Sequence, residues 1–278
     1  MNHASGIDQA NAFRAMHDRT RVLVLPNAWD AGSARLFEQL GFAAIATTSA
    51  GVAWSLGYAD GERAPLAEVV AATARIVRTV ALPVSVDIEA GYGDTAAQVA
   101  DSVRAIIGAG AVGINLEDGV HHGMLRDAVD AARRIEAARH AAVGAGVPIV
   151  INARTDTYLL DVGASPAERF DDTVQRARNY LAAGADCIYP IGVADRATIA
   201  ALVEAIDASV NIGARPGVPD LADLARLGVA RVSTATRLAT VALSAARDAA
   251  AALLASGRFD GLVATLGHAD AQHLFARD

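Results

Sequence analysis

The chain has 278 residues, of which 53% are hydrophobic, and it carries a formal net charge of −7. That length and hydrophobic fraction suit one large α/β domain, or two small ones, with a substantial buried core. No run rich in lysine and arginine stands out, which argues against nucleic acid as a partner, and the single cysteine, Cys187, excludes an intrachain disulfide.

Two segments bear on where the protein resides. Residues 1–20 mix charged with small residues and have no apolar core, so we do not interpret them as a signal peptide. The uncharged stretch 39–59 approaches the length of a membrane span, but glycine, serine and threonine interrupt it. We interpret it as a buried strand followed by an active-site loop, and we expect a cytoplasmic protein with no membrane partner.

Short apolar runs alternate along the chain with longer segments of helical periodicity. Several helical segments are followed by glycine, the residue expected where a helix ends in the left-handed conformation. These glycines are Gly41, Gly110, Gly146, Gly184 and Gly228. The expected strands are 22–25, 43–47, 84–87, 113–116, 149–153, 187–189, 210–212 and 231–233. The expected helices are 33–40, 66–80, 95–108, 127–143, 166–183, 195–205 and 220–227.

Eight β/α units in a chain of this length predict a (β/α)8 TIM barrel. A doubly wound open sheet is the competing interpretation, which the lack of a Gly-x-Gly-x-x-Gly fingerprint after the first strand weakens. Two further helices are expected at 236–256 and 262–275. Because a barrel needs one helix there, we expect the other to pack against a partner subunit. The chain, 1–278, is then one domain with a C-terminal helical extension over about 236–278.

Small residues follow the second expected strand, and their backbone N–H groups can surround an anion. They are Thr48, Ser49, Ala50 and Gly51, and we expect them to bind substrate. Asp60 lies further on, in the Gly-flanked segment 57–61. On its own it would be a turn residue, but it could add an acidic group above a metal.

Asp87 and Glu89 are two residues apart at the end of the third expected strand, so they share a face at the active-site end of a barrel. Two carboxylates there repel unless a cation or a proton relieves them. Mg²⁺ prefers oxygen ligands and keeps several waters, so we expect a magnesium site, with Mn²⁺ as an alternative ion. Asp94, before Thr95, is expected to cap the next helix rather than to bind metal.

Glu117 and Asp118 repeat this pattern one strand later. A shared metal site is favoured for Glu117, whereas a structural role is equally plausible for Asp118. The segment 120–125, which contains His121 and His122, is expected to be a mobile lid, because neighbouring side chains on a strand face opposite sides. Cys187 lies within an apolar strand and is expected to be a buried, inert thiol.

Arg154 ends the fifth expected strand. A guanidinium group can bind a carboxylate or a phosphate through two hydrogen bonds, which suits a small anionic substrate. The alternative is a structural ion pair with Asp156 or Glu117, and both roles can hold together.

Taken in order, these motifs resemble those of the isocitrate lyase/phosphoenolpyruvate mutase superfamily. Each match is weak alone, but jointly they are highly specific, and they span residues 22–235. The matching segments are 26–30 (PNAWD), 48–51 (TSAG), 57–61 (GYADG), 86–93 (VDIEAGYG), 114–118 (INLED) and 152–156 (NARTD).

The resemblance implies a barrel whose eighth helix is exchanged with a neighbouring subunit, in a homotetramer built as a dimer of dimers. It also implies Mg²⁺ held by Asp87. The residues implied to contact the ion through water are Asp60, Glu89 and Glu117.

A 2-oxo acid or enolate is the ligand that the resemblance implies. The groups implied to hold it are Ser49, Ala50 and Gly51, with Arg154 also in contact. The shared chemistry makes or breaks a C–C or P–C bond next to an enolpyruvate-like intermediate, which Mg²⁺ stabilises as a Lewis acid.

The chain departs from the superfamily in its lid. Lyases of the family carry a Lys-Lys/Arg-Cys-Gly-His motif whose cysteine works as acid or base, whereas residues 120–124 read VHHGM. The lysine- and asparagine-containing lid of the phosphonate-handling members is missing too, and Glu89 stands where the mutases usually have aspartate. The resemblance therefore favours cleavage of an oxaloacetate-like 2-oxo acid to enolpyruvate, which is protonated to pyruvate, with His121 or His122 as the proton donor.

Two alternatives stay open. One is another reaction of the superfamily, namely phosphonopyruvate hydrolysis, mutase chemistry, or 2-methylisocitrate lyase-like cleavage with His121 in place of the cysteine. The other is a catalytically silent barrel that binds a metabolite. The complete set of Asp87, Glu117 and Arg154 argues against silence, because a silent barrel does not need a complete metal site.

Overall fold

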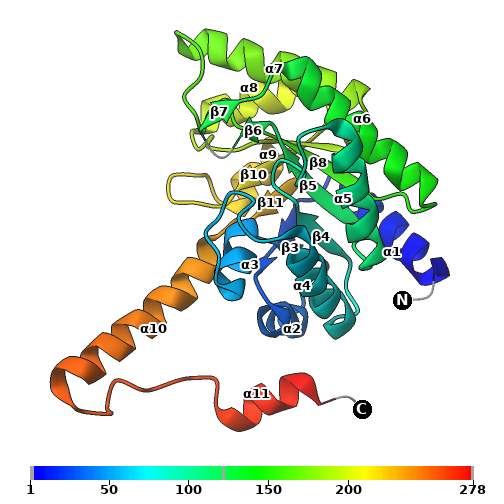
Figure 1. Cartoon of the computed structure of the whole chain (residues 1–278). Coiled ribbons are helices and arrows are strands. Elements are labelled where there is room, and N and C mark those ends of the chain that lie inside the picture. Colours follow the sequence, from blue (N-terminus) through cyan, green and yellow to red (C-terminus); the bar gives the residue numbers. More distant parts are fainter. Residues whose placement is uncertain (1–2, 121–122, 277–278) are drawn as a thin grey trace.

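A computed structural model describes residues 3–120 and 123–276. Its main sheet is parallel and curves into a barrel surrounded by helices (Figure 1), which confirms the predicted (β/α)8 TIM barrel. The strands of this sheet are β1 (Leu23–Leu25), β2 (Asn27–Ala28), β3 (Ile45–Thr47), β4 (Val84–Asp87), β5 (Gly113–Glu117), β8 (Val150–Thr155), β9 (Cys187–Pro190), β10 (Ser209–Gly213) and β11 (Arg231–Ser233). Their order is β1-β11-β10-β9-β8-β5-β4-β3-β2.

The barrel closes at its first strand, which Pro26 divides into β1 and β2. β1 pairs with β11 and β2 pairs with β3, both in parallel. Proline has no N–H to donate to a ladder, but the Pro26 carbonyl still accepts from the Ala46 amide at 3.0 Å. One broken strand therefore joins the two edges, and the C-terminal ends of all the strands meet at one mouth.

The helices predicted between the strands are all present. They are α2 (Ala31–Gln39), α4 (Leu66–Thr79), α5 (Ala96–Gly108), α6 (Ala128–Gly144), α7 (Pro166–Ala182), α8 (Arg196–Ile206) and α9 (Leu221–Arg226). The five glycines predicted to end helices all have positive φ, between 69° at Gly146 and 102° at Gly184. Glycine adopts this conformation without a Cβ penalty, so the helix-end prediction is confirmed.

Three details of the sequence interpretation were wrong. The segment expected to be an active-site loop forms a helix, α3 (Ser49–Leu56). Helix α11 (His268–Phe275) begins six residues later than the expected 262. The cap of α5 is Thr95, not Asp94, because the Thr95 hydroxyl accepts from the Gln98 amide at 3.3 Å and the Gln98 side chain reaches back to the Thr95 amide.

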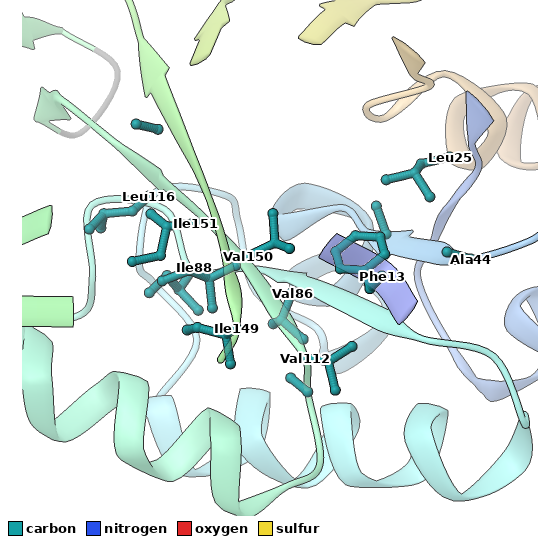
Figure 2. Close-up of a cluster of buried hydrophobic side chains, with 14 of the residues drawn as sticks. Phe13, Leu25, Ala44, Val86, Ile88, Val112, Leu116, Ile149, Val150 and Ile151 are labelled. Carbon is teal, nitrogen blue, oxygen red and sulfur yellow. The ribbon is translucent and has the colours of Figure 1, made fainter. Parts of the chain in front are cut away.

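The N-terminal helix α1 (His3–Ala15), which the sequence interpretation did not include, closes the bottom of the barrel. Phe13 is completely buried in the same cluster as Leu25, Val86 and Val112 (Figure 2). A β-carbon on Gly113 would lie 2.7 Å from the Phe13 ring, so glycine at this point of β5 leaves room for the ring. The opposite, C-terminal mouth is therefore the open end of the barrel.

Helix α10 (Arg237–Ser256) extends away from the barrel, and α11 returns to lie beside α2 (Figure 1). Of the most apolar 18-residue stretch of α10, 6% is buried within this chain. Among the described residues it is the one helix long and apolar enough to cross a membrane, by length and composition only. Exchange of this helix with a neighbouring subunit stays a prediction, as does the single-domain organisation.

Candidate active site

A cavity of about 370 Å³ opens at the C-terminal ends of the barrel strands. Five of the predicted site residues line it: Thr48, Ser49, Asp60, Asp87 and Arg154. A larger cavity, of about 820 Å³, lies at the N-terminal ends of β4, β5 and β8 and has no carboxylate in its lining. The predicted site residues therefore gather at the smaller cavity, at the end where barrel enzymes carry their active sites.

Asp87, the last residue of β4, is the central carboxylate. Its Oδ2 accepts from the Ser49 amide at 3.4 Å, and its Oδ1 accepts from the Glu89 amide at 3.2 Å. Burial raises the pKa of Asp87, and the nearby Asp60 adds to the rise, although Arg154 opposes it. A bound cation would relieve the cost of keeping this buried carboxylate ionised.

Glu89 joins two loops beside the cavity through hydrogen bonds, one containing Gly61 and Glu62 and the other containing Tyr92. Its Oε2 accepts from the backbone amides of Gly61 and Glu62, both at 2.8 Å, and its Oε1 accepts from the Tyr92 hydroxyl at 2.9 Å. Burial, together with the charge of Asp87, raises the pKa of Glu89 to about 7. These contacts support the segment that carries Asp60, a role that the prediction of a water-mediated metal contact did not include.

The loops that Glu89 joins contain strained backbone. Glu62, Glu89 and Tyr92 have φ angles of 59°, 51° and 55°, in the left-handed region. Such conformations cost about 1–3 kcal/mol each in non-glycine residues and persist where surrounding contacts hold them. The hydrogen bonds among these three residues supply those contacts.

Arg154 is held between two carboxylates. Its Nε and Nη2 donate to the two oxygens of Asp156 at 2.6 and 2.8 Å, and its Nη1 lies 2.5 Å from Glu117 Oε2. Although burial works against the charged form, Glu117 and Asp156 hold the pKa of Arg154 above its usual value. Burial also raises the pKa of Glu117, with Arg154 opposing. The structural ion pair is therefore present, and Arg154 still lines the cavity.

Asp118 belongs to the framework rather than to the cavity. It is buried and accepts from the Tyr180 hydroxyl at 2.6 Å, the Asp156 amide at 2.8 Å and Arg176 Nη1 at 3.3 Å. These bonds join β5, β8 and α7. For Asp118, a metal-binding role and a structural role were both open, and these bonds support the structural role.

His121 and His122 lie outside the described residues. The segments that flank them, β6 (Gly119–Val120) and β7 (Met124–Leu125), pair as an antiparallel hairpin above the barrel. Cys187 is completely buried, and burial raises the pKa of its thiol to about 12, in keeping with the expected inert role.

The predicted anion-binding residues form the start of α3. Thr48 caps the helix and, with Ser49, lines the cavity, whereas Ala50 and Gly51 lie buried behind it. A β-carbon on Gly51 would lie 2.6 Å from Thr48 Cγ2 and 2.8 Å from Trp29 Cβ, so glycine allows α3 to pack closely here. The N–H groups of a helix N-terminus favour an anion, so the helix is compatible with the predicted role, which stays a prediction.

The acidic residues fit an ion held largely through water. Within residues 3–120 and 123–276, no group of three or more histidine, cysteine or acidic side chains is arranged to hold a metal directly. However, Asp87 and Asp60 line one small cavity, and both raise the pKa of Glu89. Mg²⁺ usually binds through one or two carboxylates and keeps several waters, and this donor set suits that mode.

Several cavity residues were missed by sequence reasoning, notably Asn115, Tyr189 and Ser233. All three lie in strands at inward positions, where an apolar residue is the default expectation. The available signal was Asn115 in the run INLE, Tyr189 in CIYP and Ser233 in RVS. A polar side chain on the inner face of a barrel strand, near the C-terminal end of that strand, faces the mouth of the barrel.

Comparison with protein families gives a match to the phosphoenolpyruvate phosphomutase family over residues 13–254. An uncharacterised protein of Mycobacterium tuberculosis is 38% identical over 242 residues, which cover 87% of this chain and 88% of the relative. An oxaloacetate decarboxylase of Rhodopseudomonas palustris is 30% identical and the match covers 88% and 87%. The 2-methylisocitrate lyase of Escherichia coli is 30% identical and the match covers 82% and 73%.

Solved structures give the same relationship. A candidate lyase or mutase of Burkholderia cenocepacia superposes with a TM-score of 0.90 at 38% identity, and the match covers 99% of this chain and 98% of that one. Phosphonopyruvate hydrolase, solved with oxalate and Mg²⁺, has the same fold, with a TM-score of 0.82 at 24% identity and coverage of 96% and 94%.

Proposed function

The chain belongs to the phosphoenolpyruvate phosphomutase family, within the isocitrate lyase/phosphoenolpyruvate mutase superfamily, and on that premise we propose that it is a Mg²⁺-dependent lyase of a small 2-oxo acid. The proposed reaction is the decarboxylation of an oxaloacetate-like acid to pyruvate. The proposal includes a cytoplasmic location. It also includes His121 or His122 as the proton donor.

The observation that carries the proposal is the composition of the C-terminal cavity. About 370 Å³ suits a small acid, and the lining combines carboxylates, an arginine and a helix N-terminus. The oxaloacetate decarboxylase relative matches nearly the whole chain. The cavity contains no cysteine, since Cys187 is buried in β9, and this favours decarboxylation over lyase chemistry that needs a cysteine acid.

The chain's own residues bind and orient the substrate. The N–H groups at the start of α3 are proposed to receive a carboxylate of the acid, with Arg154 as the cationic group of the cavity. Because Asp156 and Glu117 fix the guanidinium, Arg154 loses little side-chain freedom when substrate binds. Asp87 would hold Mg²⁺ directly, with Asp60, Glu89 and Glu117 acting through water.

The reaction needs an electron sink at C2. Mg²⁺, when bound near Asp87, would supply Lewis-acid polarisation of the 2-oxo group. In the proposed decarboxylation the C3–C4 bond breaks, C4 leaves as CO₂, and the bonding electron pair forms the C2=C3 double bond of enolpyruvate. A proton delivered to C3 completes pyruvate.

A second candidate is cleavage of a 2-methylisocitrate-like acid. The Escherichia coli relative favours it, at 30% identity over 234 residues. That reaction would need a histidine of the lid to replace the family's cysteine. Phosphonopyruvate hydrolysis or mutase chemistry is the remaining enzymatic alternative, and a binding-only barrel is the non-enzymatic one.

The test is pyruvate release, with and without Mg²⁺, from oxaloacetate, phosphonopyruvate and 2-methylisocitrate in parallel. Oxaloacetate should give metal-dependent release, and Asp87→Ala should reduce it by about 10³-fold or more, because the charge that holds the ion is lost. Asp94→Ala is the matched control, since Asp94 is exposed on the same β4–α5 connection. Release from another substrate would reassign the reaction, and release from none would favour the binding-only barrel.

A further inference from the structure

Arg231 lies on β11 inside the barrel, below the cavity, and is completely buried. Its Nη2 donates to Asn115 Oδ1 at 3.3 Å. Its Nε and Nη1 have no hydrogen-bond partner among the residues that the structure describes. Burying the charged side chain of an arginine inside the barrel costs free energy. The hydrogen bond from Arg231 to Asn115, which lines the active-site cavity, suggests a functional role for this arginine.

A guanidinium group can donate hydrogen bonds but cannot accept them. The atom of Asn115 that faces Arg231 must therefore be the oxygen. Asn152 adds a second donor on the same side, because its Nδ2 lies 2.7 Å from Asn115 Oδ1. Arg231 can only donate, so it determines which way the Asn115 amide is turned, and the Asn152 amide donates to the same oxygen.

The Asn115 NH₂ group must then point away from Arg231 and Asn152. Asn115 lines the active-site cavity, and it stands beside Asp87 in the β4–β5 ladder. The carboxylates of Asp60 and Asp87, which also line this cavity, can only accept hydrogen bonds when ionised. The Asn115 NH₂ group is a donor in the same lining, and a donor suits an oxygen of an anionic ligand. An asparagine turned the other way would present its oxygen to the anion and its NH₂ to Arg231, and both contacts would be repulsive.

We propose that Asn115 donates a hydrogen bond from Nδ2 to a carboxylate or oxo oxygen of the bound acid, and that Arg231 is the positioning residue that fixes the direction of this donor. The inference rests on the proposed function only in taking a small 2-oxo acid as the ligand. It also accounts for an amide rather than a carboxylate at position 115, because an aspartate there would add a charge next to Asp87.

Asn115→Asp tests the donor, because it replaces NH₂ by oxygen at nearly the same shape. The KM for the acid that the wild type turns over should rise by about tenfold or more, the usual effect of losing a hydrogen bond to a charged group. The Kd of oxalate, measured by calorimetry with Mg²⁺, should rise similarly. Asn115→Ser, which is too short to reach the ligand, should weaken binding in the same way and serves if the aspartate variant does not fold.

Arg231→Met tests the positioning role. It should raise KM and the oxalate Kd severalfold, while Arg231→Lys, which keeps a donor, should lie closer to the wild type. Ser85→Ala is the matched control, because Ser85 is another buried polar residue on the inner wall beside Gly113, and its hydroxyl has no hydrogen-bond partner among the described residues. A purely structural role for Arg231 would lower the Tm but leave the KM of the folded enzyme unchanged.

The oxalate measurement separates this inference from the proposed function. Wild-type oxalate binding that Asn115→Asp and Arg231→Met leave unchanged overturns the inference, whichever acid is the substrate. Oxalate binding that both variants weaken, with no turnover of any 2-oxo acid, supports the inference and overturns the proposed lyase. A wild type that binds neither oxalate nor oxaloacetate overturns both.

Discussion

Arg154 shows at the scale of one residue how a structural and a functional role share a side chain. Both oxygens of Asp156 and one of Glu117 contact its guanidinium group. Arg154→Lys keeps the charge but cannot form the planar, two-bond contact. We expect the KM for the 2-oxo acid to rise at least about tenfold, with a lower Tm because a buried carboxylate loses a partner. Steady-state kinetics and thermal unfolding measure the two effects, and an unchanged KM would remove Arg154 from substrate binding.

Glu89 predicts how stability depends on pH. Its carboxyl has an ordinary pKa of 4.5 and a folded pKa of about 7, raised by burial and by Asp87. Between these values the folded state binds more protons at Glu89 than the unfolded state does, so the contribution of Glu89 to stability is complete below the unfolded pKa and is lost as the pH rises through the folded pKa. The full effect is roughly 3 kcal/mol.

Glu89→Gln should remove this dependence while keeping the loops joined. A glutamine can accept from the Gly61 and Glu62 amides through its oxygen and donate to the Tyr92 hydroxyl through its nitrogen. In a chelator, the Tm of the wild type should fall more between pH 4.5 and 7.5 than the Tm of the variant. Parallel curves for the two proteins would show that Glu89 does not titrate in this range.

The polar residues at the strand ends were predictable because their sequence context is local. Asp87, Glu117 and Arg154 each end an apolar run, and barrel geometry brings such ends together. The partners of these residues were not predictable to the same extent. For example, Glu89 accepts from the backbone amides of Gly61 and Glu62. These bonds form because two loops meet in space, and the spacing of residues in the sequence does not predict that meeting.

At the scale of one element, α3 depends on close packing at Gly51. Gly51→Ala would place a methyl group within 2.6 Å of Thr48 Cγ2 and 2.8 Å of Trp29 Cβ. Overpacking of this kind costs about 1–3 kcal/mol. We therefore expect a lower Tm and, because the helix N-terminus shifts, a higher KM.

The control for that change is Gly144→Ala at the end of α6, where a β-carbon meets nothing within 4 Å. Alanine favours a helix over glycine by up to about 1 kcal/mol, so this variant should be neutral or more stable. If Gly51→Ala behaves like Gly144→Ala, then α3 can shift without cost and its position does not determine substrate binding.

The elements that the sequence did not reveal are those with weak patterns. α3 reads SAGVAWSL, in which serine and glycine resemble a loop, and its helix depends on the Thr48 cap and on packing against the barrel. α1 has no clear apolar face over 3–15, although Phe13 closes the barrel. The eight strands and seven β/α helices were predictable because the apolar periodicity is clear in each unit, and in five of the units a terminal glycine agrees with it.

For the whole molecule, α10 carries apolar side chains that the single chain does not cover. Val241, Leu243 and Leu254 are 64%, 56% and 90% exposed on a helix that extends from the barrel. Exposed apolar surface of this extent marks an interaction site. We propose that α10 packs against a neighbouring subunit, as expected for a homotetramer built as a dimer of dimers.

Leu254→Glu should therefore lower the mass of the particle in solution, measured by light scattering after size exclusion, because a charge would be buried at the interface. Val143→Glu on α6 is the matched control, since Val143 is 70% exposed on another helix and should leave the mass unchanged. A wild type with the mass of one 278-residue chain would contradict the oligomer. A wild type that requires detergent and partitions into vesicles would assign α10 to a membrane instead, because the helix meets the length and composition of a span.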